Sequence, residues 1–221
     1  MAAVRVGGAA GDPGSAAPRP SVSHPLSRVV DVSLPPFAVV DLETSGLNTR
    51  RHRILQLGLV IVEPDGTVVD QWESLVKLRW PLQRVGPTHV HGITRTALRG
   101  APTLDETLDE LGRRLGGAVF TAHNAEFDSG FLARAIRRRP IDDPVRRGLE
   151  PRLCTLRMSR RLDPEREQSH RLIDVCMRYG VRLDRPHDAL GDAAATAAVL
   201  PHLLAAHGIT EPEQLEPFYV R

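Results

Sequence analysis

The sequence predicts an α/β domain with a mixed β-sheet flanked by helices. Three runs of apolar and β-branched residues follow one another from residue 37 onward, and short connections join them. A helix with a clear start signal comes next, then a fourth short apolar run, and helical patterns fill most of the remainder. Consecutive strands followed by alternating helices and strands favour a mixed sheet with helices packed on it.

The first three strands are expected at Phe37–Leu42, Ile54–Glu63 and Val68–Lys77. The turn-forming stretch EPDGT at Glu63–Thr67 separates the second from the third. Short connections favour antiparallel neighbours, so these strands form a predicted meander. Residues 78–100, which include Pro81, Pro87 and Gly92, are expected to form a loop.

A helix is predicted to start at Thr103, because Thr103 and Glu106 form the capping-box pattern T-x-x-E. Leucines follow at helical spacing at positions 104, 108, 111 and 115. Gly116-Gly117 ends this helix, and the apolar run Ala118–Ala122 is the fourth predicted strand.

Helical patterns dominate the rest of the chain. A helix is expected from about Glu126 to Arg138, and a loop with three prolines over residues 139–151. Three further helices are predicted at Thr155–Arg161, Ser169–Tyr179 and Asp188–Ala206.

Composition divides the chain of 221 residues into one domain and two tails. Residues 1–34 are rich in Ala, Gly, Pro and Ser and predict a disordered tail. Residues 35–208 form the expected domain, and residues 209–221 a C-terminal tail.

Bulk properties favour a cytoplasmic protein with no membrane contact. The start of the chain lacks the apolar region of a secretory signal, and no apolar run approaches the roughly 18 residues of a membrane span. Cys154 and Cys176 show no metal-site spacing, so two reduced thiols are expected. The formal net charge of +2 gives no case for nucleic-acid binding by the molecule as a whole.

Two carboxylates, Asp41 and Glu43, stand at the end of the first strand. Alternate residues of a strand share a face, so both can point at one spot, where they repel unless a cation lies between them. A solvated strand end with an Asp cap and turn is the alternative. Asp128 follows the fourth strand and falls in the first turn of a helix, where a role at the helix N-terminus is the alternative. If the fourth strand lies parallel beside the first, Asp128 reaches the same edge as Asp41 and Glu43.

A third stretch, PHDALGD at Pro186–Asp192, adds a histidine and a carboxylate. Asp188 is a candidate cap of the last helix, and Asp192 shares an inward face with Ala195, Thr196 and Val199. A carboxylate on an inward face needs a partner, which a metal shared with Asp41 supplies. On a continuous helix residues five apart diverge, so His187 can meet Asp192 only from the loop before the helix.

Together the stretches DLETSGL, HNAEFDSGFL and HDALGD, with VHGIT at Val90–Thr94, resemble the DEDDh (DnaQ-like) family of 3′–5′ exonucleases. The likeness to the proofreading (epsilon) subunits of bacterial DNA polymerase III is the strongest, and it covers about Phe37 to His207. It implies a ribonuclease-H-like fold. His187 identifies the branch, because the sister branch has a tyrosine at the position of Asp188.

The resemblance also implies the chemistry. Asp41, Glu43, Asp128 and Asp192 would hold two divalent metal ions, Mg²⁺ or Mn²⁺, and His187 would be the general base for the attacking water. The expected reaction is hydrolysis of single-stranded DNA from its 3′ end, which releases nucleoside 5′-monophosphates in proofreading or repair.

Substrate contacts follow from the same resemblance. Thr44, Leu47, Asn124 and Phe127 match positions around the terminal nucleotide, although core packing is the alternative for Leu47 and Phe127. Three arginine clusters are candidates for phosphate contacts, or else solvated faces: Arg50-Arg51, Arg137–Arg139 and Arg146-Arg147.

Two alternatives to a DNA exonuclease remain at this point: an RNA exonuclease on the same fold, and a non-catalytic nucleic-acid-binding module. A DNA polymerase or the sliding clamp is a candidate protein partner. The segment QLEPF at Gln214–Phe218 resembles a clamp-binding peptide, with packing of Leu215 and Phe218 on the domain as the alternative.

Overall fold

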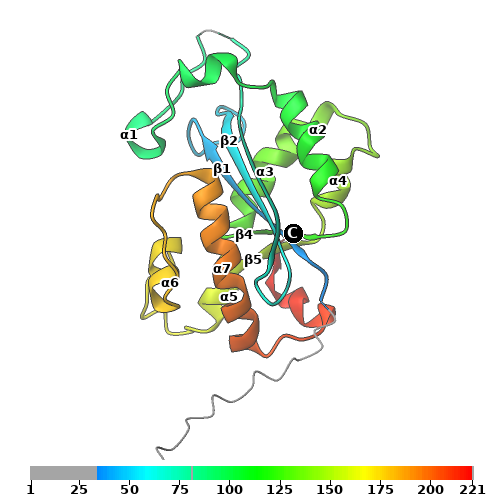
Figure 1. The fold of residues 1–221 in the computed structure, drawn as a ribbon, viewed down its shortest axis with the longest axis vertical. Helices are drawn as coiled ribbons and strands as arrows, with labels where there is room; N and C mark the ends of the chain where they lie inside the picture. Colours follow the sequence, from blue (N-terminus) through cyan, green and yellow to red (C-terminus); the bar gives the residue numbers. More distant parts are fainter. Residues whose placement is uncertain (1–33, 81, 221) are drawn as a thin grey trace, which may run out of the picture. The chain divides into compact units, whose positions relative to one another are not determined.

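The computed structural model describes residues 34–80 and 82–220, which belong to one compact unit. The tail predicted for residues 1–34 lies outside them, apart from Leu34. Six strands form one sheet in the order β3-β2-β1-β4-β5-β6 (Figure 1). The strands are β1 Phe37–Thr44, β2 Ile54–Val62, β3 Val68–Leu75, β4 Val119–Ala122, β5 Arg152–Cys154 and β6 Tyr219–Val220.

The sheet is mixed, as predicted. β1, β2 and β3 form the expected antiparallel meander, whereas β4 runs parallel to β1 and β5 parallel to β4. β6 closes the far edge as an antiparallel neighbour of β5. β5 and β6 were not predicted, because strands of three and two residues carry no periodicity that a sequence can display.

Seven α-helices are described: α1 Thr88–His91, α2 Leu104–Arg114, α3 Ala125–Ala135, α4 Pro144–Gly148, α5 Thr155–Arg161, α6 Leu172–Arg178 and α7 Ala189–His207. Three 3₁₀ helices accompany them: η1 Ala97–Gly100, η2 Ile136–Arg138 and η3 Pro212–Phe218. The capping box of Thr103 and Glu106 is present and starts α2. The expected loop at residues 78–100 contains α1 and η1, and the expected loop at residues 139–151 contains α4. These helices are too short to show a helical period in the sequence.

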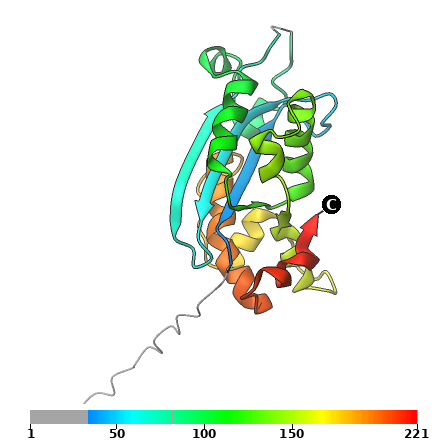
Figure 2. The same cartoon turned by 90° about the vertical axis from the view of Figure 1, so that its right-hand side faces the viewer.

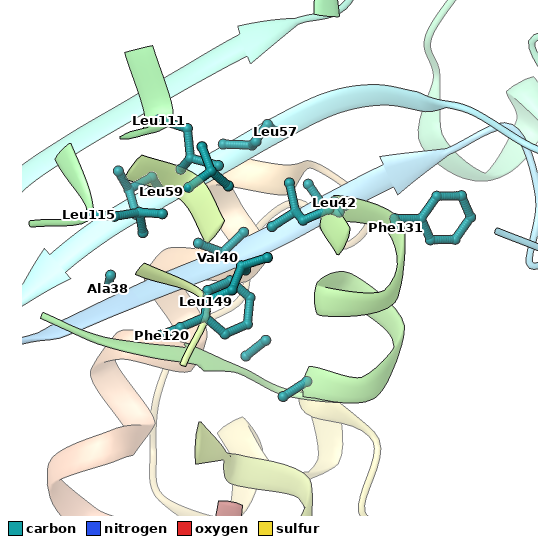
Figure 3. Close-up of a cluster of buried hydrophobic side chains, with 14 of the residues drawn as sticks. Ala38, Val40, Leu42, Leu57, Leu59, Leu111, Leu115, Phe120, Phe131 and Leu149 are labelled. Carbon is teal, nitrogen blue, oxygen red and sulfur yellow. The ribbon is translucent and has the colours of Figure 1, made fainter. Parts of the chain in front are cut away.

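Helices cover both faces of the sheet (Figure 1). The side chains of Ala38, Val40 and Leu42 in β1 pack with α2, α3 and α4 in one core (Figure 3). The intervening residues Phe37 and Val39 pack in a second core with α5, α6 and α7. Alternation along β1 therefore directs Asp41 and Glu43 to the face that α7 covers.

α7 is the main helix of that second core. Its length of 19 residues and its apolar composition alone would allow it to cross a membrane, a criterion that buried core helices also meet. It instead packs on β1 and β2, and it buries residues along most of its length. The hydropathy of α7 is thus that of a core helix.

The C-terminal segment folds back onto the domain. In both views η3 lies at the opposite end of the domain from α1, and β6 runs from η3 toward the middle of the domain (Figures 1 and 2). Leu215 and Phe218 are buried in the second core, and the ring of Phe218 lies 4.6 Å from that of His207. The packing alternative for Gln214–Phe218 therefore holds in this structure, because both apolar side chains face the domain.

Replacing Phe218 should test this packing. We expect Phe218→Ala to lower the free energy of unfolding by about 3 kcal/mol, because it removes a buried aromatic side chain. The exposed neighbour Glu216 is the control, and Glu216→Ala should stay within about 0.5 kcal/mol of the parent. Equal stability of the two variants in urea unfolding would contradict the packing.

Candidate active site

The site is built at the C-terminal end of β1. Asp41 and Glu43 are two residues apart on one face of the strand, and a bulge interrupts the pairing with β2 between Glu43 and Thr44. Bulges of this kind redirect side chains beside functional sites. Glu43 is 9% exposed. Both carboxylates therefore stand on the face toward α7, in surroundings that disfavour charge.

The parallel pairing of β1 with β4 positions Asp128 beside the end of β1. That pairing ends at Val39 and Thr121, and α3 follows directly after β4. The Oδ1 atom of Asp128 accepts a hydrogen bond of 3.2 Å from the backbone N–H of Leu42, on the edge of β1. The predicted arrangement, in which parallel strands bring Asp128 to Asp41 and Glu43, is what the structure shows.

His187 and Asp192 meet at the start of α7. His187 lies on the loop before the helix with a φ of 66°, a left-handed conformation that non-glycine residues rarely adopt. Its backbone N–H donates to Oδ2 of Asp192 at 3.1 Å, and Oδ1 of Asp192 has no hydrogen-bond partner among the described residues. Ligand atoms of Glu43, His187 and Asp192 lie within 4.8 Å of one another.

Two residues of β2 that the sequence analysis missed fix the position of this helix start. Gly58 pairs with Asp41, and a Cβ added to Gly58 would lie 2.2 Å from the carbonyl oxygen of Ala189. Gln56 pairs with Glu43, and its Nε2 atom donates to Oδ1 of Asp188 at 3.1 Å. The glycine gives α7 room to approach, and the glutamine holds it there.

Asp188 does not cap α7, contrary to the expectation. It occupies the N-cap position, but its side chain makes no capping hydrogen bond and instead binds Gln56, with Arg185 at 3.4 Å. Its charge adds to the carboxylate cluster. The bond between Asp188 and Gln56 joins residues far apart in the sequence, so no local motif could have predicted it.

Repulsion and burial raise the pKa values of the whole cluster. Burial raises the pKa of Asp41 well above its usual value, and the charges of Asp128, Asp192, Glu43 and Asp188 raise it further. Burial, with Asp192 and Asp188, raises the pKa of Glu43 to about 7.

The two remaining carboxylates respond in the same direction. Burial raises the pKa of Asp128 to about 7, against the hydrogen bond from Leu42. Burial also raises the pKa of Asp192, although the N–H of His187 partly opposes it. A cluster of acids that resists ionisation in this way could hold a cation.

The four residues expected to contact the substrate surround this cluster in different ways. Leu47 is 84% exposed on the β1–β2 loop, so the core-packing alternative does not apply to it. Asn124 is exposed at the start of α3, and Phe127 is half-buried with its ring 5.0 Å from that of Phe131. Thr44 is buried, and its hydroxyl donates to the carbonyl of Gly46.

Two histidines near the motifs are structural. His123 is hydrogen-bonded to Thr155 at 3.0 Å and to the carbonyl of His170 at 2.9 Å, so both of its ring nitrogens have partners in the protein. His91 of the VHGIT stretch is buried and accepts from the N–H of Ile93. Burial lowers the pKa of His91, and the charge of His187 lowers it further.

Comparison with known proteins agrees with this geometry. The family model described as "Exonuclease" (RNase_T) matches residues 38–200. The chain belongs to this exonuclease family. DNA polymerase III PolC-type of Streptococcus thermophilus is 33% identical over 183 residues, which are 81% of this chain and 12% of the polymerase. The chain thus spans a small part of that relative.

Solved structures confirm the ribonuclease-H-like fold of the exonuclease domain. Exonuclease X in complex with 5′ overhanging duplex DNA has a TM-score of 0.63 at 24% identity, covering 82% of this chain and 99% of that one. The nuclease domain of 3′hExo, a DEDDh family member bound to rAMP, has a TM-score of 0.65 at 16% identity. This match covers 83% of this chain and 96% of the 3′hExo chain.

The close approach at Gly58 yields a test of how the exonuclease domain positions α7. Gly58→Ala should displace the start of α7 with His187 and Asp192, and we expect turnover to fall by about 100-fold. A Cβ at Gly100 would meet nothing within 4 Å, so Gly100→Ala is the matched control and should keep its rate. Equal rates for the two alanine variants would refute the docking role of Gly58.

The raised pKa values predict how stability depends on pH without metal. The native state holds protons on Glu43 and Asp128 up to about pH 7, whereas unfolded carboxyls lose them near pH 4. Native protein thus binds more protons in this window, and its free energy of unfolding should fall as pH rises from about 4 to 7.

Thermal melts in EDTA and in Mn²⁺ would measure this effect. The melting temperature in EDTA should fall over that pH range, and Mn²⁺ should restore it most at the alkaline end. A variant with Glu43→Gln and Asp128→Asn should show a weaker pH dependence and a weaker response to Mn²⁺, because Asp41 and Asp192 remain. A wild-type melting temperature that rises with pH in EDTA would show that the carboxylates do not repel.

Proposed function

We propose that this chain is a metal-dependent 3′–5′ exonuclease that hydrolyses phosphodiester bonds of single-stranded DNA and releases nucleoside 5′-monophosphates. One observation carries the proposal: Asp41, Glu43, Asp128 and Asp192 converge with His187 at the end of β1. The family match, which spans residues 38–200, supports it.

The proposal assigns two divalent ions, Mg²⁺ or Mn²⁺, to this donor set. Buried Asp192 has an Oδ1 atom without a hydrogen-bond partner among the described residues, which could bind a hard cation. A cation would also relieve the repulsion among the acids. Asp41, Glu43, Asp128 and Asp192 would hold the ions. When bound, the ions would lower the pKa of water and neutralise charge on the phosphate and the leaving oxygen.

His187 is the proposed general base. Its backbone is fixed through the N–H bond to Asp192, whereas its side chain is exposed and its ring is available to a water molecule. Histidine is the commonest general base of enzymes, so this ring can accept a proton from the attacking water during hydrolysis. The left-handed backbone of His187 brings the ring within reach of Glu43 and Asp192.

Leu47, Asn124, Phe127 and Thr44 are the proposed contacts to the terminal nucleotide. Exposed Leu47 would press against the last base, because an isolated apolar side chain in water gains from a stacked partner. The backbone near Thr44, held by the bond to Gly46, would bind the terminal 3′ hydroxyl.

DNA is the favoured substrate, because relatives at 31–33% identity are DNA polymerases of the PolC type. An RNA exonuclease is the second candidate, since a fold neighbour is described as bound to rAMP. A non-catalytic binding module is not favoured, because all four carboxylates and His187 come together. Action in proofreading or repair in the cytoplasm remains part of the proposal.

A DNA polymerase is the proposed protein partner, as the PolC-type relatives suggest. Docking of Gln214–Phe218 on the sliding clamp is disfavoured. A clamp-binding peptide needs exposed apolar anchors, and here Leu215 and Phe218 are in the core.

A gel at single-nucleotide resolution would test the activity. With Mg²⁺, a 5′-labelled DNA single strand should shorten from its 3′ end, and the matched RNA should shorten more slowly. Asp41→Asn should abolish the ladder, because it removes a charge from the centre of the cluster. A ladder that persists in this variant or in EDTA would contradict the proposal, and faster RNA cleavage would favour the second candidate.

His187→Ala should separate catalysis from metal binding. We expect turnover to fall by about 100-fold or more, since general-base catalysis contributes about that much. The thermal stabilisation by Mn²⁺ should persist, because the four carboxylates remain. Full turnover in this variant would disprove the assignment of the base.

A further inference from the structure

A groove lined by cationic side chains lies at the C-terminal end of α3, outside the carboxylate site. Two adjoining hollows form it, and both are lined by Arg53, Ile54, Arg79, Leu104 and Arg138. One hollow also includes Arg134 and Arg137, and the other Lys77 and Trp80. The groove thus runs between the β1–β2 loop, the residues after β3, the start of α2, and α3 with η2.

The charge of the groove is almost entirely positive. Asp105 is the one acidic residue among the described residues that line it. Asp105 lies 3.5 Å from Arg139, which is also paired with Asp109 and Asp143. The charge of Asp105 is therefore balanced by Arg139. The other cationic side chains of the groove have no carboxylate among its described lining residues.

The structure separates the arginine clusters that the sequence offered for phosphate contacts. Arg139 is held by three aspartates, and the guanidinium of Arg146 donates to backbone carbonyls of Ile136, Arg139 and Pro140. Arg137 and Arg138 are exposed and enter no ion pair among the described residues.

Arg134, one helical turn before Arg138, is likewise exposed and enters no ion pair in the described part of the chain. The groove therefore holds several arginines whose charge no described carboxylate neutralises.

The groove adjoins the carboxylate site through α3. Phe131 lines the groove, lies at the end of the core cluster (Figure 3), and packs 5.0 Å from Phe127 of the proposed substrate contacts. Thr49, another lining residue, lies so near α3 that a Cβ on Gly130 would be 3.6 Å from its methyl group. Gly130 is two residues after Asp128, so the groove begins within a helical turn of the site.

Trp80 gives the groove an aromatic wall. Its side chain is 60% exposed, and the guanidinium of Arg79 lies 5.5 Å from the ring centroid. An exposed tryptophan beside cations is the combination that binds single-stranded nucleic acid, because bases stack on the ring while cations contact phosphates.

We propose that this groove binds the sugar–phosphate backbone of the substrate strand beyond the terminal nucleotides, irrespective of base sequence. The inference rests on the proposed function, since the strand in the groove is the one whose end reaches Asp41 and Asp128. A continuous polyanion fits a channel with several unpaired cations, and base stacking on Trp80 adds affinity without sequence preference.

Charge reversal in the groove tests the proposal. Arg134→Glu with Arg138→Glu, placed in the Asp41→Asn background, would be compared with Arg161→Glu and Arg171→Glu, two exposed arginines outside the groove. Fluorescence anisotropy would follow a labelled oligothymidylate of about 20 nucleotides, longer than one such groove holds. Salt would range from about 50 to 200 mM.

The groove variant should bind the long strand at least 10-fold more weakly at about 0.1 M salt. The slope of log affinity against log salt should become shallower by about 1.4, as two lost phosphate contacts require. With Asp41 intact, the groove variant should hydrolyse oligomers of about three nucleotides at the parent rate, because these occupy only the metal site. The control variant should match the parent throughout.

Equal losses in the groove and control variants, or no loss in either, would overturn the proposal. If short oligomers are hydrolysed normally and the groove substitutions do not change strand affinity, the groove proposal is wrong and the exonuclease proposal is retained. If the groove substitutions weaken strand binding but no strand is ever cut, the groove proposal is retained and the exonuclease proposal is wrong. A wild-type chain that binds no oligonucleotide would overturn both.

Tryptophan fluorescence gives an independent reading. The chain has two tryptophans, and Trp72 is half-buried beside Arg114. In a Trp72→Phe background, unlabelled oligothymidylate should quench the emission of Trp80, and Arg134→Glu with Arg138→Glu should remove the quenching at the same strand concentration. Emission that does not change while the strand binds would place the nucleic acid elsewhere.

Discussion

Repulsion among buried carboxylates at the end of β1 is the constraint on which the rest of this structure depends. Burial and neighbouring charge raise the pKa values of Asp41, Glu43, Asp128 and Asp192 together, so each acid opposes ionisation of the next. Left alone, such a cluster destabilises the fold. Packing in the domain must therefore hold the cluster together, and a bound cation would compensate its charge.

Three features of the fold supply that packing. The parallel pairing of β1 with β4 stops early enough for Asp128 to bind the N–H of Leu42. Gly58 leaves room for α7 to approach β2, and Gln56 is hydrogen-bonded to Asp188 at the start of α7. Together they place Asp192 near Glu43. Neither β2 residue touches the cluster through a charge, yet both determine its geometry. Stability and chemistry are thus coupled at the start of α7.

The sequence predicted most of what local pattern can encode. The long strands, the capping box of Thr103, the carboxylate positions and the loop placement of His187 all follow from periodicity and spacing. β5 and β6 were missed because a strand of two or three residues exists only through its partner. The roles of Gln56, Gly58 and Asp188, and the gathering of Arg53, Arg79 and Arg134 in one groove, depend on contacts between distant segments.

The carboxylate cluster and the cationic groove carry opposite charges, and the two proposals assign cations to the first and a polyanion to the second. The central claim is that the four acids hold the catalytic metals. Crystals soaked with Mn²⁺ and a nucleoside 5′-monophosphate would test it by anomalous diffraction. Two peaks about 4 Å apart among Asp41, Glu43, Asp128 and Asp192 are expected. Manganese bound elsewhere, or no peak at these residues, would contradict the account.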